Sequence, residues 1–447
     1  MKFCFPENFL FGAASSACQI ESAAYEGGKG EDVIGHYYSK LPEKFHGADP
    51  NDSADFYHRY REDIEMMKEL GLDAFRFSIS WSRIFPNGPE ESNPAGIAYY
   101  NDMIDALKDA GIVTFFDLFH CDLPYWVIEK GGILNPEFIR WFETYAKTCF
   151  KELGCRVDYW CTVNEPSINC FGAYANESNA PFLKDMDKAI RASHNMLLAH
   201  YSAIRLYKSM NLQGKIGAVI HVEPNYALSL DAMDKEAAGR NFDFYSGWWL
   251  DPMLLGHYPE SLMDYPYLTD KLPANFKKEL SENFVENDYI AINYYSPAFA
   301  RYKKNGELGL EIFHNEKLAR DDYGFFIYPP GLYDTLLYLK QEYPGKEIII
   351  AENGISRKKC GDLELELDDE YRIDYMREHL REVSRAIASG APVRGYFHWS
   401  IMDTNEAYAG GYDHIFGLVQ INYKTLERRR RKSWYYYQNL IKNREVD

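Results

Sequence analysis

The 447-residue sequence has no excess of positive charge: 49 lysine and arginine residues stand against 67 aspartate and glutamate residues, a formal net charge of −18. Nucleic acids and anionic membrane surfaces are bound by positively charged faces, so we expect no nucleic acid and no membrane as partner. The sequence also lacks an apolar run of about 18 residues, the length that crosses a membrane. Pro6 interrupts the N-terminal segment before a secretion signal could form. We therefore expect a cytoplasmic protein.

Cysteine is sparse, and none of the 8 cysteines forms a C-x-x-C pair or stands beside a histidine at zinc-like spacing. This argues against a zinc knuckle. Several of the cysteines lie in apolar runs, where a reduced thiol behaves as a small hydrophobic side chain. We expect reduced thiols and no metal site. Aromatic residues, by contrast, make up 16% of the chain, enough for a large core or for a site that stacks on sugar rings.

No low-complexity linker divides the chain, and no G-x-G-x-x-G follows the first apolar run, so the main signal for a doubly wound sheet is missing. Short apolar runs instead alternate with amphipathic segments such as Asp55–Leu70. This alternation predicts an α/β fold, a single (β/α)8 TIM barrel with long βα loops that spans residues 1–447 as one catalytic domain. The predicted strands are Phe9–Ala14, Ala74–Ile79, Val113–Phe119, Val157–Val163, Ile216–Ile220, Tyr289–Ile292, Glu347–Ala351 and Gly395–Trp399.

Polar or aromatic side chains stand at the ends of seven of these runs, at the edge where a (β/α)8 barrel places its active site. Caps and turns account for one such residue but not for the whole set. After the fifth run come His221 and Glu223, to which we assign a capping or loop role. The set consists of Gln19, Arg76, His120, Asp122, Asn164, Glu165, Asn293, Tyr295, Glu352, Trp399 and Glu406.

Two glutamates end the fourth and seventh runs, in TVNEP and IIIAENG. We expect these two strands to face each other across the barrel, so that Glu165 and Glu352 converge. Retaining glycoside hydrolysis requires two carboxyl groups about 5–5.5 Å apart. The ionised one attacks the anomeric carbon, while the other, kept protonated by its neighbour's charge, protonates the leaving oxygen. Arg76 and Tyr295 are available to hold the buried carboxylate of Glu352.

Longer motifs surround these residues, namely FPENFLFGAASSACQIESA, FRFSISWSRIFP, LFHCDLPYW, TVNEP, AINYYSP, AENG, GYFHWSIMDTNE and FGLVQINY. In this order, and along nearly the whole chain, they resemble glycoside hydrolase family one, the β-glucosidase family. The resemblance implies the barrel, retention of anomeric configuration and no cofactor. It implies a small-molecule β-glycoside or oligosaccharide as partner, and it leaves a homo-oligomer open.

The resemblance also implies roles for the matching residues. Glu165 matches the acid/base and Glu352 the nucleophile, with Arg76 and Tyr295 holding the nucleophile ionised and oriented. Asn164 matches the residue that binds the sugar 2-OH. The remaining matches are Gln19, His120 and Glu406 as ligands of other hydroxyls, Asn293 as a pocket residue and Trp399 as the stacking floor.

The chain departs from the family pattern beside the sugar. Cys121 and Ala407 stand where the family usually has tryptophans that help bind the sugar near its 3-OH, and Tyr408 is placed to reach into the space that Ala407 leaves. Phe325 stands where a tryptophan on the aglycone side is common. We expect a retaining exo-β-glycosidase whose glycone pocket is altered near the 3-OH.

Several alternatives stay open. If neighbouring loops refill the space, the enzyme is an ordinary broad β-glucosidase, β-galactosidase or β-fucosidase. The 6-phospho branch of the family is a second reading, although the carboxylate of Glu406 would repel a phosphate dianion. A catalytically silent sugar-binding protein and a metal-dependent barrel enzyme using His120 and Asp122 are the others. Separately, we expect the basic run Arg428–Arg431 to form a solvated face beside the last helix.

Overall fold

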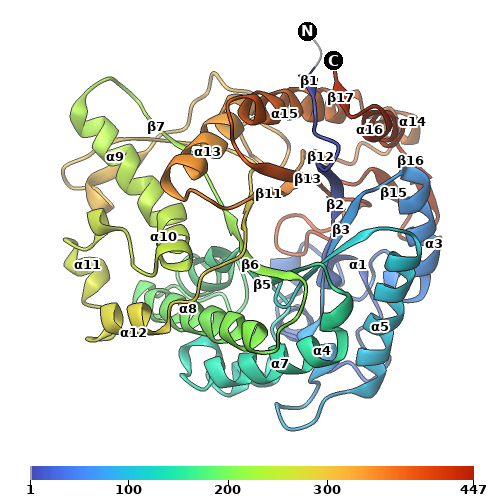
Figure 1. Cartoon of the computed structure of the whole chain (residues 1–447), viewed down its shortest axis with the longest axis horizontal. Coiled ribbons are helices and arrows are strands. Elements are labelled where there is room, and N and C mark those ends of the chain that lie inside the picture. The colour runs from blue at the N-terminus through green and yellow to red at the C-terminus, as the bar shows by residue number, and fades with distance from the viewer. Residues whose placement is uncertain (1–2) are drawn as a thin grey trace.

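The computed structural model describes residues 3–447. Parallel strands form a closed barrel in the order β11–β13–β2–β3–β4–β5–β6–β8, and helices surround it (Figure 1). The predicted strands are all present, so the predicted (β/α)8 barrel is confirmed. The barrel strands are β2 (Leu10–Ala14), β3 (Ala74–Ser78), β4 (Val113–Asp117), β5 (Tyr159–Asn164), β6 (Lys215–His221), β8 (Ile290–Asn293), β11 (Ile348–Asn353) and β13 (Val393–Trp399).

The order of strands around the ring corrects one expectation. Strands β5 and β11, which carry the two glutamates at their ends, have β6 and β8 between them. They are therefore three steps apart around the ring, and the strand opposite β5 is β13. The two strands do not face each other directly, but both point their carboxyl ends at the same rim of the barrel.

The outer helices follow the amphipathic pattern of the sequence. In α3 (Phe56–Leu70) the residues Phe56, Tyr60, Ile64 and Met67 return every three or four positions and are buried. This helix ends at Gly71, whose φ of 80° lies in the left-handed region that favours glycine. The other long helices are α5 (Pro94–Asp109), α7 (Phe138–Leu153), α8 (Met186–Ser209), α13 (Pro329–Glu342), α15 (Glu370–Ala388) and α16 (Lys432–Asn443).

The connections beyond the strand ends carry shorter elements, as the predicted long βα loops require. A three-stranded sheet of β10 (Leu310–Ile312), β9 (Ala298–Tyr302) and β7 (Asn225–Ala227) lies outside the barrel. None of the helices in the described part of the chain combines the length and the apolar character that a bilayer crossing needs. The shorter helices are α1 (Ala17–Ile20), α2 (Val33–Lys40), α4 (Trp81–Ile84), α6 (Tyr125–Glu129), α9 (Ala232–Phe242), α10 (Trp248–Leu255), α11 (Pro266–Thr269), α12 (Phe276–Asn283) and α14 (Leu363–Leu367). The short pairs are β1 (Phe3–Cys4) with β17 (Glu445–Val446), β12 (Arg357–Lys358) with β14 (His414–Ile415), and β15 (Val419–Ile421) with β16 (Arg428–Arg430).

Aromatic side chains fill the interior of the barrel. The ring of Phe115 lies 5.7 Å from that of Tyr289 and 5.8 Å from that of Phe397, both at steep angles. The guanidinium of Arg76 lies 5.7 Å from the centre of the Phe115 ring. This aromatic layer is therefore a packed floor beneath Arg76, and it separates the charged groups above it from the lower half of the barrel.

The basic run near the C-terminus forms the expected solvated face only in part, at Arg429 and Arg430. Arg431 is fully buried and donates to both carboxylate oxygens of Asp403, at 2.8 and 2.9 Å. Arg428 is partly buried, with 6% of its side chain exposed, and forms the same two-pronged pair with Asp63, with both distances 2.9 Å. The expectation was wrong for these two residues because buried carboxylates from distant segments compensate their charges.

Candidate active site

A cavity of about 490 Å³ opens at the carboxyl ends of the barrel strands. Arg76, Asn164 and Asn293 are buried directly beneath it and contact its wall. The residues predicted from separate strand ends therefore gather in one place, except Asp122, which is fully buried outside the cavity lining. The predicted residues that line the cavity are Gln19, His120, Cys121, Glu165, Tyr295, Phe325, Glu352, Trp399, Glu406, Ala407 and Tyr408.

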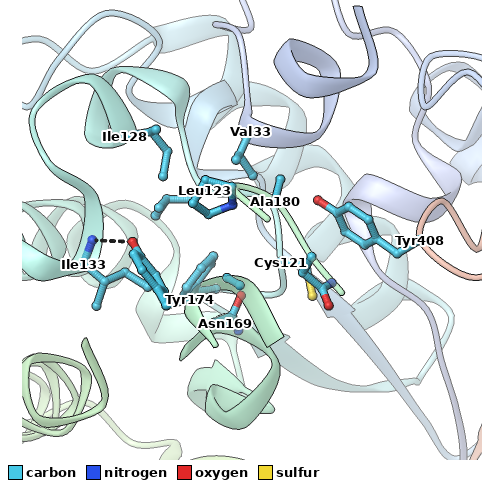
Figure 2. A pocket seen from close by; sticks show the side chains of 13 residues that line it. Val33, Cys121, Leu123, Ile128, Ile133, Asn169, Tyr174, Ala180 and Tyr408 are labelled. Atoms are coloured by element: carbon cyan, nitrogen blue, oxygen red, sulfur yellow. Dashed lines mark hydrogen bonds between the residues drawn. The ribbon is translucent and has the colours of Figure 1, made fainter. Parts of the chain in front are cut away.

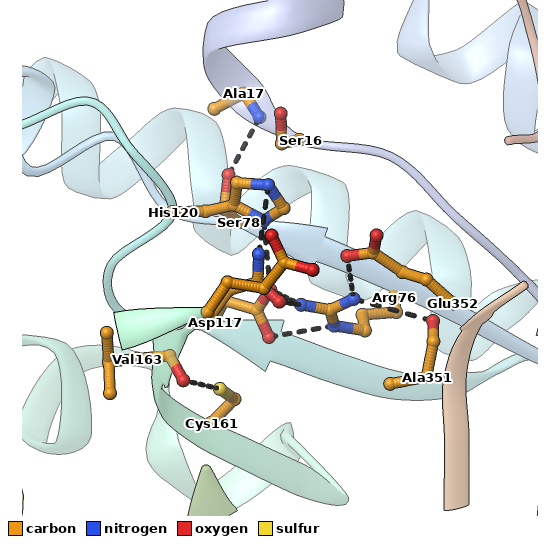
Figure 3. A network of polar contacts seen from close by, with 12 residues as sticks. Ser16, Ala17, Arg76, Ser78, Asp117, His120, Cys161, Val163, Ala351 and Glu352 are labelled. Carbon is orange, nitrogen blue, oxygen red and sulfur yellow. Dashed lines mark hydrogen bonds and ion pairs between the residues drawn. The ribbon is translucent and has the colours of Figure 1, made fainter. Parts of the chain in front are cut away.

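Glu352, at the end of β11, is held by a buried ion-pair network (Figure 3). Arg76 Nη1 donates to Glu352 Oε1 at 2.7 Å. The same guanidinium donates through Nε and Nη2 to Asp117 on β4, at 3.1 and 2.5 Å. Because Arg76 and Asp117 are almost completely removed from solvent, each charge depends on the other for compensation. Asp117 therefore fixes the arginine that in turn fixes Glu352.

The second oxygen of Glu352 is also bound. The hydroxyl of Tyr295 donates to Oε2 at 2.7 Å. Burial raises the pKa of Glu352, the charge of Arg76 opposes that rise, and the nearby charge of Glu165 adds to it. With a donor on each oxygen, the carboxylate is held in one orientation toward the cavity.

A chain of hydrogen bonds connects the two glutamates. Arg76 Nη2 donates to Asn164 Oδ1 at 2.7 Å, and Asn293 Nδ2 donates to the same oxygen at 3.1 Å. Asn293 Nδ2 also contacts Glu165 Oε1 at 2.9 Å. Glu165 and Glu352 therefore line one cavity and belong to one polar network.

The backbone of Glu165 has an uncommon conformation. Its φ is 43°, in the left-handed region that few residues other than glycine adopt. The N–H of Glu165 donates to the carbonyl of Val219 on β6 at 2.9 Å, which holds this turn in place. Backbone strain of this kind persists where the surrounding structure imposes it, often at functional sites.

His221 ends β6 and Glu223 lies in the loop after it, and both line the cavity, which the capping or loop role that we assigned to them did not include. His221 Nδ1 lies 3.2 Å from Glu165 Oε1, and His221 Nε2 lies 3.5 Å from Glu223 Oε1. Burial alone would lower the pKa of His221, but the two carboxylates outweigh it and raise the pKa to about 10. Burial would likewise raise the pKa of Glu165, but the contact with His221 lowers it to about 2. We expected the charge of Glu352 to keep Glu165 protonated. The contact with His221 instead favours the ionised form of Glu165.

The other predicted sugar-binding residues, Gln19, His120, Trp399 and Glu406, form a second group in the cavity lining, here called the sugar-binding wall. Glu406 Oε1 accepts hydrogen bonds from Gln19 Nε2 at 3.0 Å and from Thr404 Oγ1 at 2.7 Å. Burial raises the pKa of Glu406 to about 7. The rings of Trp399 and His120 are nearly parallel, at 17°, with centres 5.8 Å apart. This wall offers hydrogen-bonding groups beside a flat apolar face, the combination that a sugar ring requires.

The positions that depart from the family pattern lie together beside this wall. Tyr408 packs on Phe45 and Phe182, with ring centres 5.2 and 6.0 Å apart. Cys121 and Tyr408 also line a small cavity of about 20 Å³ behind the main one (Figure 2). That volume is enough for about one water molecule.

Phe325 forms the wall on the side of Glu352. Its ring stacks on Tyr295 at 5.2 Å and on Tyr323 at 4.9 Å. All three rings line the main cavity. Tyr295, which binds Glu352, is thus also part of an aromatic stack at the cavity wall.

Three residues of the network were missed from the sequence. His221 ends the fifth barrel strand, β6, and Glu223 follows it, as the predicted residues do at the other strands, so the rule that found those residues should have included them. Asp117 stands inside the third apolar run. Because a buried charge needs a partner of opposite charge, its position in a buried strand indicates a buried cation beside it.

Comparisons with known proteins show which family the chain resembles over its length. The model of the family described as glycosyl hydrolase family 1 matches residues 1–446. The chain is 38% identical to a β-glucosidase A of Acetivibrio thermocellus over 448 residues, 99% of each chain. It is 35% identical to a 6-phospho-β-galactosidase of Clostridium acetobutylicum, across 98% of this chain and 96% of that relative. The solved structure of a β-glucosidase from Thermotoga maritima in complex with deoxynojirimycin is similar, with a TM-score of 0.95, 34% identity and 100% of both chains covered.

Proposed function

Because the chain belongs to glycosyl hydrolase family 1 and is a glycoside hydrolase of the β-glucosidase type, we propose how it acts. Residues 1–447 form one exo-acting catalytic domain. It removes a terminal β-linked sugar by double displacement with retention of configuration. The observation that carries this proposal is the hydrogen-bonded chain from Glu165 through Asn293, Asn164 and Arg76 to Glu352. It places two carboxyl groups in different environments at one cavity, as this chemistry requires.

In the first step, Glu352 attacks the anomeric carbon while the leaving oxygen receives a proton at Glu165. The fixed donors on Glu352 keep its attacking oxygen aligned, which reduces the entropy lost on reaching the transition state. In the second step, Glu165 takes a proton from water, which displaces Glu352 from the sugar. Asn164 is placed to bind the sugar 2-OH, a contact that strengthens as positive charge develops on the ring.

The pocket is altered near the sugar 3-OH. Cys121 and Ala407 present small side chains to the cavity, and Tyr408 fills only part of the adjoining space. The absence of two indole N–H donors would weaken the binding of a plain glucoside by about 1–3 kcal/mol where a polar group is left unpaired. A sugar that carries a substituent at O3 can use the space instead.

A phosphorylated sugar is disfavoured by the same wall. No lysine or arginine is among the described residues that line the main cavity, and Glu406 is the charged group beside the sugar-binding wall. A phosphate dianion would meet the carboxylate of Glu406 at that wall and no lysine or arginine in the lining. The sugar that we propose is therefore uncharged, although a 6-phospho-β-galactosidase is among the relatives.

A nitrophenyl glycoside panel tests the proposal. It compares β-glucoside, β-galactoside, β-fucoside, a 3-O-substituted β-glucoside and a 6-phospho-β-glucoside, with dialysis against EDTA as a check on metal dependence. We expect the β-anomer as first product by NMR, a higher kcat/KM for the 3-O-substituted sugar than for plain glucoside, and the same rates in EDTA. Plain glucoside and cellobiose cleaved faster than the substituted sugar would contradict the altered pocket. The α-anomer as first product would contradict the mechanism.

A further inference from the structure

His221 lines the cavity and also contacts two carboxylates. Its Nδ1 lies 3.2 Å from Glu165 Oε1, and its Nε2 lies 3.5 Å from Glu223 Oε1. The three side chains form a row from the outer loop to the acid/base position, and about a fifth of the imidazole is exposed, at 21%. The imidazole therefore lies between two carboxylates, and both of its ring nitrogens have an acidic partner.

This arrangement rests on the proposed function of Glu165, and it goes further. We propose that His221 and Glu165 act together as the proton donor to the leaving oxygen, with Glu223 holding His221 in its charged form. His221 is then a positioning and proton-storing residue, which acts through Glu165 and does not touch the sugar itself. Both His221 Nδ1 and Asn293 Nδ2 contact Oε1 of Glu165, and Oε1 is the oxygen that receives the proton of His221.

The two protonation equilibria support this pairing. The contact with His221 lowers the pKa of Glu165 to about 2, and the carboxylates raise the pKa of His221 to about 10. Between these values the pair holds one proton that the two residues share. A glutamate alone would lose its proton in the middle of that range. The pair therefore supplies a proton at neutral and mildly alkaline pH, where an isolated carboxyl group could not.

The proton balance is closed in both steps. In the first, the proton of His221 Nδ1 moves to Oε1 of Glu165, the carboxyl group turns to present this same proton to the leaving oxygen, the proton moves to that oxygen as its bond to C1 breaks, and Glu352 bonds to C1. In the second, water attacks C1, the bond to Glu352 breaks with its electron pair returning to the carboxylate, and the water proton passes through Glu165 back to His221. The imidazole is neutral only between the two steps.

Among the residues that the structure describes, the charged groups in contact with His221 are carboxylates. The titratable groups that face it are Glu165 from the loop after β5, Glu223 from the segment after β6 and Tyr295 from the segment after β8, whose ring lies 6.4 Å away at 17°. His120, Glu352 and Glu406 line the same cavity. Acidic groups thus dominate around the imidazole, which favours its protonated form.

The test is the pH dependence of His221→Asn, in which the amide keeps a donor near Glu165 but cannot carry a titrating proton. Phenyl β-glucoside, a poor leaving group, and 2,4-dinitrophenyl β-glucoside, a good one, are compared from pH 5 to 10. We expect kcat/KM of the variant on phenyl glucoside to stay within a few fold of wild type at pH 6 and to fall about 100-fold at pH 9. The dinitrophenyl substrate, which needs little acid assistance, should change by less than about threefold. Glu223→Gln should also move the alkaline limb of kcat/KM on phenyl β-glucoside to lower pH, by less than His221→Asn does.

His194→Asn is the matched control, because His194 is a buried histidine 3.0 Å from Glu279 on α12, away from the cavity. Its alkaline limb should coincide with that of wild type. An alkaline limb of His221→Asn equal to wild type, or a loss of equal size for both substrates at every pH, would overturn the inference while the retaining mechanism stands. Failure of the wild-type enzyme to cleave either glucoside would instead count against the proposed function itself.

Discussion

Replacing Tyr295 with phenylalanine removes a single hydroxyl that touches the proposed nucleophile. That hydroxyl donates to Glu352 Oε2 at 2.7 Å inside a buried site. The ring stays, and with it the stack on Phe325. The change therefore isolates one hydrogen bond from the shape of the pocket.

The size of the effect follows from the charge on the acceptor. A hydrogen bond to a charged group contributes about 1.5–3 kcal/mol. Since about 1.4 kcal/mol corresponds to one pKa unit, losing this bond should raise the pKa of Glu352 by about one to two units. Burial already raises this pKa, so the acid limb of the pH–rate profile moves further toward neutral pH. On the plateau, the loss of one of two anchors on the carboxylate should reduce kcat by up to about 100-fold.

The assay is kcat/KM for 4-nitrophenyl β-glucoside between pH 4 and 9, with thermal melting to confirm that the variant is folded. The matched control is Tyr289→Phe, because Tyr289 is also buried and donates one hydrogen bond, to the carbonyl of Trp160 at 2.7 Å, without contacting Glu352. We expect the acid limb of the control to coincide with that of wild type. An unchanged acid limb in Tyr295→Phe would refute the assignment of Tyr295 as the group that holds Glu352 ionised.

Three further substitutions test other parts of the account. Glu165→Gln should lower kcat/KM for phenyl β-glucoside about 1,000-fold. For 2,4-dinitrophenyl β-glucoside, the rate of the first step, measured by stopped flow, should fall much less. Equal losses for the two substrates would argue against an acid at this position. Cys121→Trp should shift the ratio of kcat/KM between 3-O-substituted and plain β-glucoside about tenfold toward the plain sugar, and an unchanged ratio would place the sugar elsewhere. Asp403→Asn leaves the charge of buried Arg431 without its partner and should lower the free energy of unfolding by about 3–5 kcal/mol in urea titration. A loss below about 1 kcal/mol there would show that solvent reaches the pair.

The fold could be predicted because its signal is repeated locally. Each barrel strand is a short apolar run, and each is followed by a helix with its own apolar face, so eight independent observations supported one architecture. The polar residues at the strand ends could be predicted for the same reason. A barrel brings these ends to one rim regardless of the details of the loops.

The contacts between segments far apart in the sequence could not be predicted in this way. His221 and Glu165 are 56 positions apart, and nothing local in either segment indicates that Oε1 and Nδ1 meet. The same limit explains the error at Arg431, whose partner Asp403 is 28 positions away. A run of arginines indicates a solvated face only when no carboxylate reaches it, and that depends on tertiary packing.

The central claim, that Glu352 forms a bond to the sugar with Glu165 at the leaving oxygen, is tested most directly by trapping with 2,4-dinitrophenyl 2-deoxy-2-fluoro-β-glucoside. The fluorine slows both steps, while the good leaving group allows the first to proceed. Intact-mass and peptide mass spectrometry should find one fluoroglucosyl group per chain, on the peptide that contains Glu352. A chain that binds the sugar without a covalent adduct, or an adduct on any other residue, would contradict the account.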